Sequence, residues 1–126
     1  MLPISGLYEV AIPVRDLGRS EAFYRDVLGL PVGLRDDRRP WVFLRVGGAA
    51  GMIVLQEQPG DVPPLHFAFA VAAADLERAT AQLRARGVEC TDPQFHAWMP
   101  ATSVYFRDPD GHDLELCAPG SRRGTA

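Results

Sequence analysis

One short stretch of the chain combines residue types that often handle protons and small molecules. Residues 96–100, with the sequence HAWMP, bring His96 and Trp98 close together. An imidazole changes charge near neutral pH, so His96 is a candidate general acid or base. We predict that the stretch is a loop forming a lid or pocket wall against a substrate. The alternative is that Trp98 and Met99 only plug one end of a sheet.

Two glutamates stand in stretches that are otherwise typical of apolar strands. Glu9 and Glu115 are each flanked on both sides by large apolar residues. A carboxylate in such a strand is costly to bury unless charge or hydrogen bonds compensate it. One divalent cation would compensate two carboxylates at once. The alternative is that both glutamates lie at exposed sheet edges.

The bulk properties limit the classes of protein that fit. The chain has 126 residues, 47% of them hydrophobic, with a net charge of −3. This predicts a single domain, residues 1–126, with a packed core. The acidic balance argues against a nucleic-acid partner. Two cysteines are too few for a disulfide framework. No apolar run is long enough to span a bilayer, which argues against a membrane as partner, and we therefore expect a cytoplasmic protein. Residues 121–126 are predicted to be a frayed end.

The chain contains an internal repeat. Short apolar runs typical of strands recur in the same order in both halves. We expect strands at residues 8–14, 30–32, 41–46 and 52–55, and again at 65–71, 88–90, 103–108 and 113–116. The predicted fold class is α+β, with two βαβββ modules that span about residues 6–60 and 64–119.

Each half also carries signals for one helix. Asp16 and Asp75 precede helical apolar patterns and are good N-cap residues, because a carboxylate accepts from the unpaired N–H groups of the first turn. Gly29 and Gly87 follow the patterns and suit a left-handed C-cap. We predict a helix between each aspartate and its glycine.

Two longer motifs resemble those of the vicinal oxygen chelate superfamily, which includes glyoxalases, bleomycin resistance proteins and extradiol dioxygenases. The opening motif is VRDLGRSEAFY at residues 14–24, followed by VLGL at 27–30. The closing motif is YFRDPDGHDLE at residues 105–115. The resemblance covers roughly residues 6–119 and implies two curled mixed sheets around a small-molecule cleft. It leaves the reaction open, because this scaffold hosts lyases, dioxygenases, epimerases, thiol transferases and metal-free drug binders.

The same resemblance implies three metal ligands, namely Glu9, His66 and Glu115. Glu9 and His66 occupy equivalent places in the internal repeat, which supports the assignment. An imidazole with two carboxylates suits a divalent Fe, Mn, Ni, Co or Zn ion. The rival interpretation makes Glu9 and Glu115 surface groups and His66 a hydrogen-bonded core histidine.

The chain departs from its relatives at two ligand positions. Many relatives have histidine where this chain has Glu9, which adds a negative charge. Glyoxalase I has a fourth ligand, a glutamate, at the position of Val54, and valine cannot coordinate. The pattern is closer to the three-ligand relatives, the extradiol dioxygenases and fosfomycin-resistance enzymes.

Further residues are candidates for touching a substrate. The resemblance implies that the phenol of Tyr105 faces the pocket, and His96 and Trp98 are the other two candidates. We interpret the Asp-Pro-Asp-Gly run at residues 108–111 as a turn and expect His112 to be exposed there.

Our first hypothesis is a metal-dependent enzyme of lyase, isomerase or dioxygenase type that chelates a small oxygen-bearing molecule. Glu9 and Glu115 would be its catalytic carboxylates, and Glu9 could also leave the metal to move a proton. The second hypothesis is a metal-free binding protein for a small molecule or antibiotic. The third is an interaction domain with a vestigial pocket. The resemblance also implies a homodimer.

Overall fold

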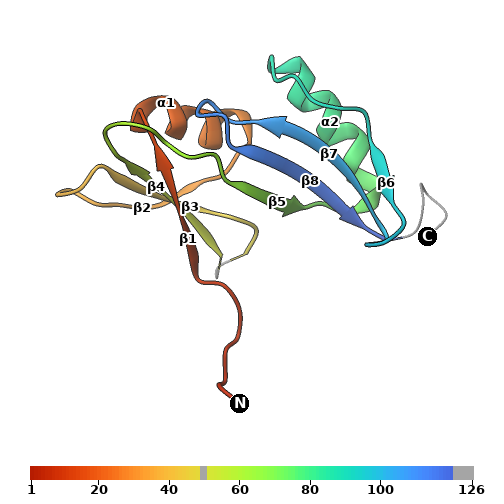
Figure 1. The fold of residues 1–126 in the computed structure, drawn as a ribbon, viewed down its shortest axis with the longest axis horizontal. Coiled ribbons are helices and arrows are strands. Elements are labelled where there is room, and N and C mark those ends of the chain that lie inside the picture. The colour runs from red at the N-terminus through yellow and green to blue at the C-terminus, as the bar shows by residue number, and fades with distance from the viewer. Residues whose placement is uncertain (49–50, 121–126) are drawn as a thin grey trace. The chain divides into compact units, whose positions relative to one another are not determined.

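The structure is a computed structural model that describes residues 1–48 and 51–120. The chain divides into two compact units between Pro63 and Pro64, close to the predicted join of the modules. Each unit has one strand, one helical segment and then three strands, so the predicted α+β fold of two βαβββ modules is confirmed (Figure 1). The predicted frayed end lies outside the described residues. None of the described helices has the length and apolar character needed to cross a membrane.

The first unit is a four-stranded sheet with one helical segment. Its elements are β1 (Glu9–Val14), α1 (Leu17–Ala22), the π-helical turn η1 (Phe23–Val27), β2 (Val32–Arg35), β3 (Trp41–Arg45) and β4 (Met52–Glu57). The strand order is β1-β4-β3-β2. Strand β1 runs parallel to β4, and the other neighbours are antiparallel. The mixed sheet therefore has β1 at one edge.

The second unit repeats this topology. Its elements are β5 (His66–Ala70), the 3₁₀ turn η2 (Ala73–Asp75), α2 (Leu76–Ala85), β6 (Gln94–His96), β7 (Ala101–Arg107) and β8 (Asp113–Pro119). The order β5-β8-β7-β6 and the parallel β5–β8 pair match the first unit. Strand β5 therefore holds the same edge position as β1.

Each sheet has two distinct faces, because successive side chains of a strand point to opposite sides. The face toward the helix is apolar and buried in both units. Buried side chains on these faces are Ile12, Val14, Val42, Leu44 and Leu55 in the first unit, and Val104, Phe106, Leu114 and Leu116 in the second. Burying this apolar surface is the main driving force for folding of each unit.

The start of α1 is held by two carboxylates. Asp16 accepts a hydrogen bond from the Arg19 N–H at 3.0 Å, which confirms the predicted cap. Glu57, at the end of β4, accepts from the Leu17 N–H at 2.8 Å. The segment ends as predicted at Gly29, whose φ of 79° is in the left-handed region. Strand β4 and the helix start are thereby connected.

The predicted capping role of Asp75 is wrong. A 3₁₀ turn begins at Ala73, so Asp75 already has helical backbone angles and its side chain makes no cap hydrogen bond. Its carboxylate accepts instead from the Arg78 guanidinium at 2.8 Å. The predicted end of the helix at Gly87 is confirmed by its φ of 83°.

The predicted strand at residues 88–90 is also wrong. This segment makes only an isolated bridge between Cys90 and Phe106. The strand of this module is β6, at Gln94–His96, which pairs with the start of β7. Pro93 lies between the two pairings and has no N–H to donate, so the edge is interrupted there.

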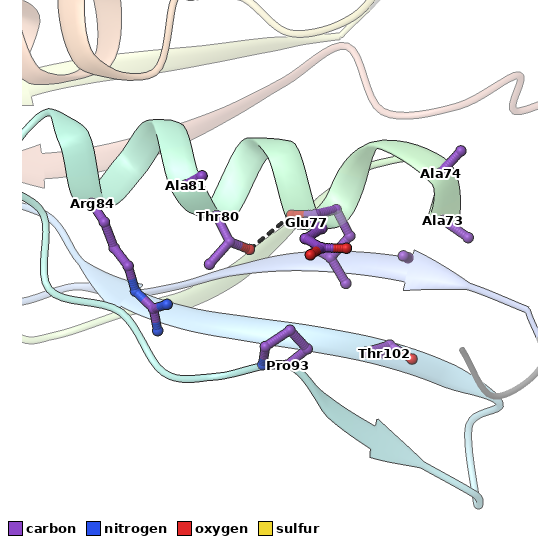
Figure 2. A pocket seen from close by; sticks show the side chains of 10 residues that line it. Ala73, Ala74, Glu77, Thr80, Ala81, Arg84, Pro93 and Thr102 are labelled. Carbon is purple, nitrogen blue, oxygen red and sulfur yellow. Dashed lines mark hydrogen bonds between the residues drawn. The ribbon is translucent and has the colours of Figure 1, made fainter. Parts of the chain in front are cut away.

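Helix α2 lies along one face of the second sheet and leaves a groove beside it. Figure 2 shows Glu77, Thr80 and Arg84 of the helix on one side of the groove, and Pro93 and Thr102 on the other. The volume of this groove is about 860 Å³. Because residues of α2 form one of its walls, the groove lies on the helix side of the sheet. Within the helix, the buried Thr80 hydroxyl donates to the Leu76 carbonyl at 2.8 Å.

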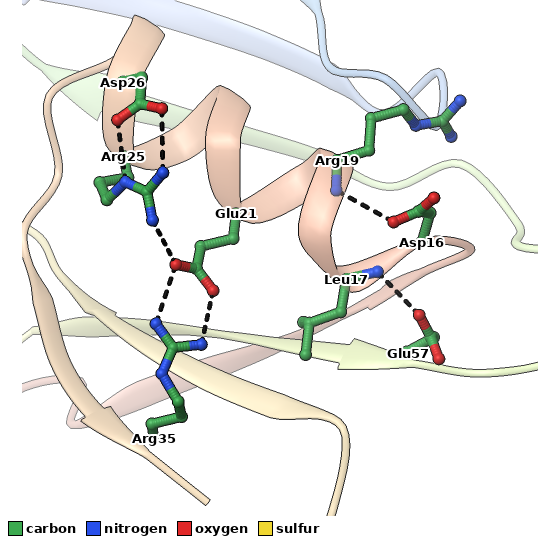
Figure 3. Close-up of polar contacts among 8 residues, drawn as sticks. All are labelled: Asp16, Leu17, Arg19, Glu21, Arg25, Asp26, Arg35 and Glu57. Atoms are coloured by element: carbon green, nitrogen blue, oxygen red, sulfur yellow. Dashed lines mark hydrogen bonds and ion pairs between the residues drawn. The ribbon is translucent and has the colours of Figure 1, made fainter.

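A cluster of charges connects α1 with β2. Glu21 is only 7% exposed, and both of its oxygens accept from the Arg35 guanidinium, at 2.7 and 2.9 Å (Figure 3). Arg25, which also pairs with Asp26, donates to the same carboxylate. These interactions hold the pKa of Glu21 below its usual range, mainly through the Arg35 hydrogen bonds. Paired charges of this kind stabilise the native state as long as the carboxylate is ionised.

We predict that Glu21→Gln lowers the free energy of unfolding by about 1–2 kcal/mol at neutral pH, because the amide cannot serve both guanidinium groups. The folded pKa of Glu21 is depressed, so its contribution is present above the unfolded value near 4.5 and is lost as the pH falls through the folded pKa. Thermal melts of both proteins from pH 7 downward should show the difference in Tm shrinking below pH 4.5.

Asp26→Asn is the matched control, since Asp26 pairs with Arg25 but its side chain is 60% exposed. It should leave the Tm nearly unchanged across the series. A difference between Glu21→Gln and wild type that stays constant down to pH 3 would contradict the electrostatic explanation.

Candidate functional site

The side of the second sheet turned away from α2 carries polar groups from all four strands. Cross-strand partners share a face, and Tyr105 pairs with Glu115, which pairs with Ala68. The following side chains make up what we call the polar face: His66, His96, Ser103, Tyr105 and Glu115. Four of these five were candidates from the sequence, and Ser103 was not.

His66 and Glu115 contact each other within this unit. The His66 Nε2 lies 3.2 Å from Glu115 Oε1, and His66 Nδ1 lies 3.1 Å from the carbonyl oxygen of Asp113. A carbonyl oxygen can only accept, so Nδ1 must carry the hydrogen and donate. Nε2 then faces a carboxylate oxygen, and a cation between the two atoms, either a proton or a metal ion, makes that contact favourable.

Glu115 lies on β8, between β5 and β7, and its exposed fraction is only 5%. Its second oxygen, Oε2, accepts a hydrogen bond from the hydroxyl of Ser103 at 2.5 Å. Ser103 is fully buried. One neutral hydroxyl compensates a buried carboxylate only in part, so the site favours an additional positive charge.

Ser103 was not among the residues predicted from the sequence, although the sequence carries a signal for it. Ser103 stands two residues before Tyr105 in the same strand, so the two side chains share a face. A serine inside an apolar strand, on the face of a candidate site residue, is a polar group that needs a partner. The identity of that partner depends on the cross-strand register, which the sequence does not state.

The spacing of His66 and Glu115 fits two ligands of one ion. Divalent metals hold imidazole nitrogen and carboxylate oxygen at about 2.0–2.2 Å, which places neighbouring ligand atoms about 3 Å apart. The observed 3.2 Å agrees with this spacing. The Nδ1 hydrogen bond to a backbone carbonyl also orients the ring, as is usual for metal-bound histidine. The donor set of the second unit therefore fits a divalent metal.

Glu9, the third predicted ligand, belongs to the first unit. It is exposed and opens β1, as His66 opens β5. Both residues lie on edge strands, on the face away from the helix of their own unit. Their equivalence in the repeat therefore extends to the three-dimensional structure of each module. That Glu9 binds the same ion as His66 and Glu115 stays a prediction.

The repeat also shows where the two units differ. In the first unit, the cross-strand row equivalent to Ala68, Glu115 and Tyr105 consists of Ala11, Val54 and Phe43. Val54 is fully buried and carries no ligand atom. This row of the first unit thus offers no ligand, and Glu9 is the candidate ligand of that unit, whereas the second unit offers His66 and Glu115.

His96 and Tyr105 form a pair on the polar face. The His96 Nε2 lies 2.7 Å from the Tyr105 hydroxyl oxygen, at hydrogen-bond distance. The prediction that His96 lies in a loop is wrong, because it ends strand β6. Trp98 follows in a turn, with its ring centre 6.2 Å from that of His96. Trp98 is 80% exposed, so it does not plug the sheet.

The Asp-Pro-Asp-Gly segment forms the predicted turn, but the expectation that His112 is exposed is wrong. His112 is fully buried, and its Nδ1 accepts the Leu65 N–H at 2.9 Å. Asp108 accepts from the backbone N–H groups of Asp110 and His112, both at 2.9 Å. The turn thereby ties the start of β5 to the start of β8.

Asp108, Asp110 and His112 are also the one group of three potential metal ligands within 4.8 Å of one another that the described residues contain. All three are buried. Asp108 and His112 already accept backbone hydrogen bonds that close the turn. We therefore assign the group to turn structure.

The groove beside α2 is separate from the polar face. Thr102 and Ala118 line it, and they alternate with Ser103 and Cys117 along their strands. The lining includes none of the candidate site residues. The groove and the His66–Glu115 pair therefore lie on opposite sides of one sheet.

The chain is similar to known proteins along most of its length. Residues 6–116 match the model of the Glyoxalase/Bleomycin resistance protein/Dioxygenase superfamily. The chain is 31% identical over 118 residues to glutathione transferase FosA of Serratia marcescens, covering 90% of the chain and 80% of FosA. It is 25% identical over 120 residues to metallothiol transferase FosB of Staphylococcus saprophyticus, covering 90% and 76%.

The structure also resembles TnmS3, an antibiotic binding protein from Streptomyces sp. CB03234. The TM-score is 0.82 at 25% sequence identity, with 95% of this chain and 100% of TnmS3 covered. Similar proteins therefore include both transferases and a binding protein.

We predict that His112→Ala destabilises the fold without removing a metal ligand. Loss of a fully buried ring and of its hydrogen bond from Leu65 should lower the free energy of unfolding by about 2–4 kcal/mol. Denaturant unfolding measures this loss, and metal analysis of the folded fraction should match wild type. Loss of bound metal with unchanged stability would instead place the ligands in this turn.

Proposed function

Because the chain belongs to the glyoxalase/bleomycin resistance protein/dioxygenase superfamily, we propose that it is a divalent-metal-dependent enzyme acting on a small oxygen-bearing molecule. The observation that carries the proposal is the His66–Glu115 pair, with 3.2 Å between potential ligand atoms and a buried carboxylate. Glu9 is the third proposed ligand.

The donor set narrows the choice of metal. One imidazole and two carboxylates suit Fe, Mn, Ni, Co or Zn as divalent ions, and leave positions for substrate oxygens. When bound, such an ion supplies Lewis-acid stabilisation of negative charge on those oxygens. Two carboxylates offset the charge of the ion, so the complete site is close to neutral.

The remaining candidate residues have roles that follow from their chemistry. The Tyr105 hydroxyl can donate to or accept from a substrate oxygen, and His96, at 2.7 Å, holds that hydroxyl in place. Exchange of a proton between His96 and Tyr105 would let the pair act as a general acid or base. The exposed ring of Trp98 offers an apolar surface for the substrate. Glu9 is the proposed carboxylate that moves a proton when the reaction requires one.

The reaction class includes lyase, isomerase and dioxygenase chemistry on this scaffold. The relatives add a further class, since FosA is a glutathione transferase and FosB a metallothiol transferase. Thiol addition to an electrophilic small molecule is therefore the first reaction to assay.

A second candidate function is metal-free binding of a small molecule or antibiotic. The similarity to TnmS3 favours it, as does the aromatic group formed by His96, Trp98 and Tyr105. Glu115→Ala separates the two functions. A binding protein would keep its ligand affinity, whereas the proposed enzyme would lose both metal and turnover.

We further propose that the protein is a cytoplasmic homodimer. Cys90 and Cys117 are both free thiols, which suits a reducing compartment. Static light scattering should give twice the chain mass of 13.8 kDa. A monomer mass at micromolar concentration would contradict the dimer.

We predict that the purified protein binds one divalent transition metal per chain and that added metal raises the Tm of the metal-free protein. His66→Ala and Glu115→Ala should abolish stoichiometric binding, because each removes a proposed ligand. Glu9→Gln should weaken binding while the fold persists, since Glu9 is exposed. Plasma emission analysis and thermal melts with Mn, Fe, Co, Ni and Zn measure these effects.

Glu77→Gln is the control, because it removes an exposed carboxylate of α2 on the other side of the sheet. It should bind metal as wild type does. Absence of metal from wild type, together with a Tm that no added ion changes, would refute metal-dependent catalysis and favour the binding function.

A further inference from the structure

Ser103 occupies a position from which it can determine how Glu115 presents its oxygens. It is fully buried on β7, and its hydroxyl lies 2.5 Å from Glu115 Oε2. We propose that Ser103 is a positioning residue that restricts Glu115 to one-oxygen coordination, through Oε1, and thereby tunes metal affinity and selectivity. The inference rests on the proposed metal-dependent function and adds a residue to its site.

The register of β7 and β8 explains how a short side chain reaches the carboxylate. Tyr105 lies directly opposite Glu115, and Ser103 lies opposite Cys117. Ser103 and Glu115 are therefore diagonal neighbours on one face of an antiparallel pair. The glutamate side chain is long enough to span the diagonal distance, and the serine hydroxyl donates a hydrogen bond to its carboxylate. The ionised carboxylate has only acceptors, so the hydroxyl donates.

The two carboxylate oxygens consequently have different partners. Oε2 accepts from Ser103, and Oε1 faces His66 Nε2 at 3.2 Å. The Ser103 hydroxyl does not compete for Oε1, which remains directed at the position that a shared ion would occupy. Rotation of the carboxylate to offer both oxygens to an ion would break a fully buried hydrogen bond.

This division of the oxygens has a consequence for selectivity. Calcium takes 6–8 oxygen ligands and often uses carboxylates with both oxygens, whereas transition metals accept a mixed set with fewer ligands. A glutamate restricted to one oxygen therefore disfavours calcium relative to manganese. Removal of the hydroxyl should lower the affinity for Mn²⁺ and also narrow the preference for Mn²⁺ over Ca²⁺. A purely structural role of Ser103 would leave that preference unchanged.

The test is Mn²⁺ and Ca²⁺ titration of metal-free wild type, Ser103→Ala and Ser103→Thr, with free Mn²⁺ counted by electron paramagnetic resonance. Ser103→Ala should weaken Mn²⁺ binding about 10–100-fold, the usual effect of removing an outer-shell hydrogen bond. Ser103→Thr keeps the hydroxyl on a β-branched side chain suited to a strand and should restore wild-type binding. Thr102→Val is the control, because it removes the neighbouring hydroxyl, on the opposite face of β7, with little change in volume.

The outcomes separate this inference from the proposed function. If wild type binds no metal, both fail, and the wild-type titration alone reveals it. If wild type binds Mn²⁺ but Ser103→Ala binds it equally well, or if alanine and threonine lose affinity equally, only the role of Ser103 is refuted. If Ser103→Ala does not fold by circular dichroism, Ser103→Gly takes its place, because it also lacks the hydroxyl: weaker Mn²⁺ binding supports the role of Ser103, and unchanged binding refutes it.

Discussion

The proposed site depends on one buried negative charge, the carboxylate of Glu115. A carboxylate that is 5% exposed in a sheet needs compensation, and only one of its two contacts is a hydrogen-bond donor. Ser103 supplies a hydrogen bond on one side, and His66 supplies an imidazole nitrogen on the other. Neither neutral group offers full positive charge, so the site favours an additional cation. The chemistry of the polar face follows from this deficit.

The repeated fold that positions this charge is stabilised by other contacts as well. Each module buries an apolar face against its helix, and the first unit adds the Glu21–Arg35 pair and two carboxylates at the start of α1. The equivalent row of the first unit is apolar, with Val54 where the second unit has Glu115. Polar residues have thus been placed at positions that the fold can fill with apolar ones, which is typical of a functional site on a general scaffold.

Local signals in the sequence predicted most of the architecture. The Asp16 cap, the glycines that end the helices and most of the apolar strands depend on near neighbours, and they are confirmed. The Asp75 error was local, because a 3₁₀ turn begins at Ala73 and the carboxylate accepts from Arg78, three residues on. The other errors arose where contacts between residues distant in sequence decide the structure: β6 forms beyond Pro93, where it pairs with β7, and the buried His112 accepts the Leu65 N–H. Ser103 was missed for the same reason, since only the β7–β8 register places it beside Glu115.

The most direct test is anomalous diffraction from crystals of the metal-free protein soaked with Mn²⁺. We expect one strong peak per chain at bonding distance from His66 Nε2 and Glu115 Oε1, with Glu9 as the third protein ligand. A peak among Asp108, Asp110 and His112, or no peak near His66 when the metal is in excess, would contradict this expectation.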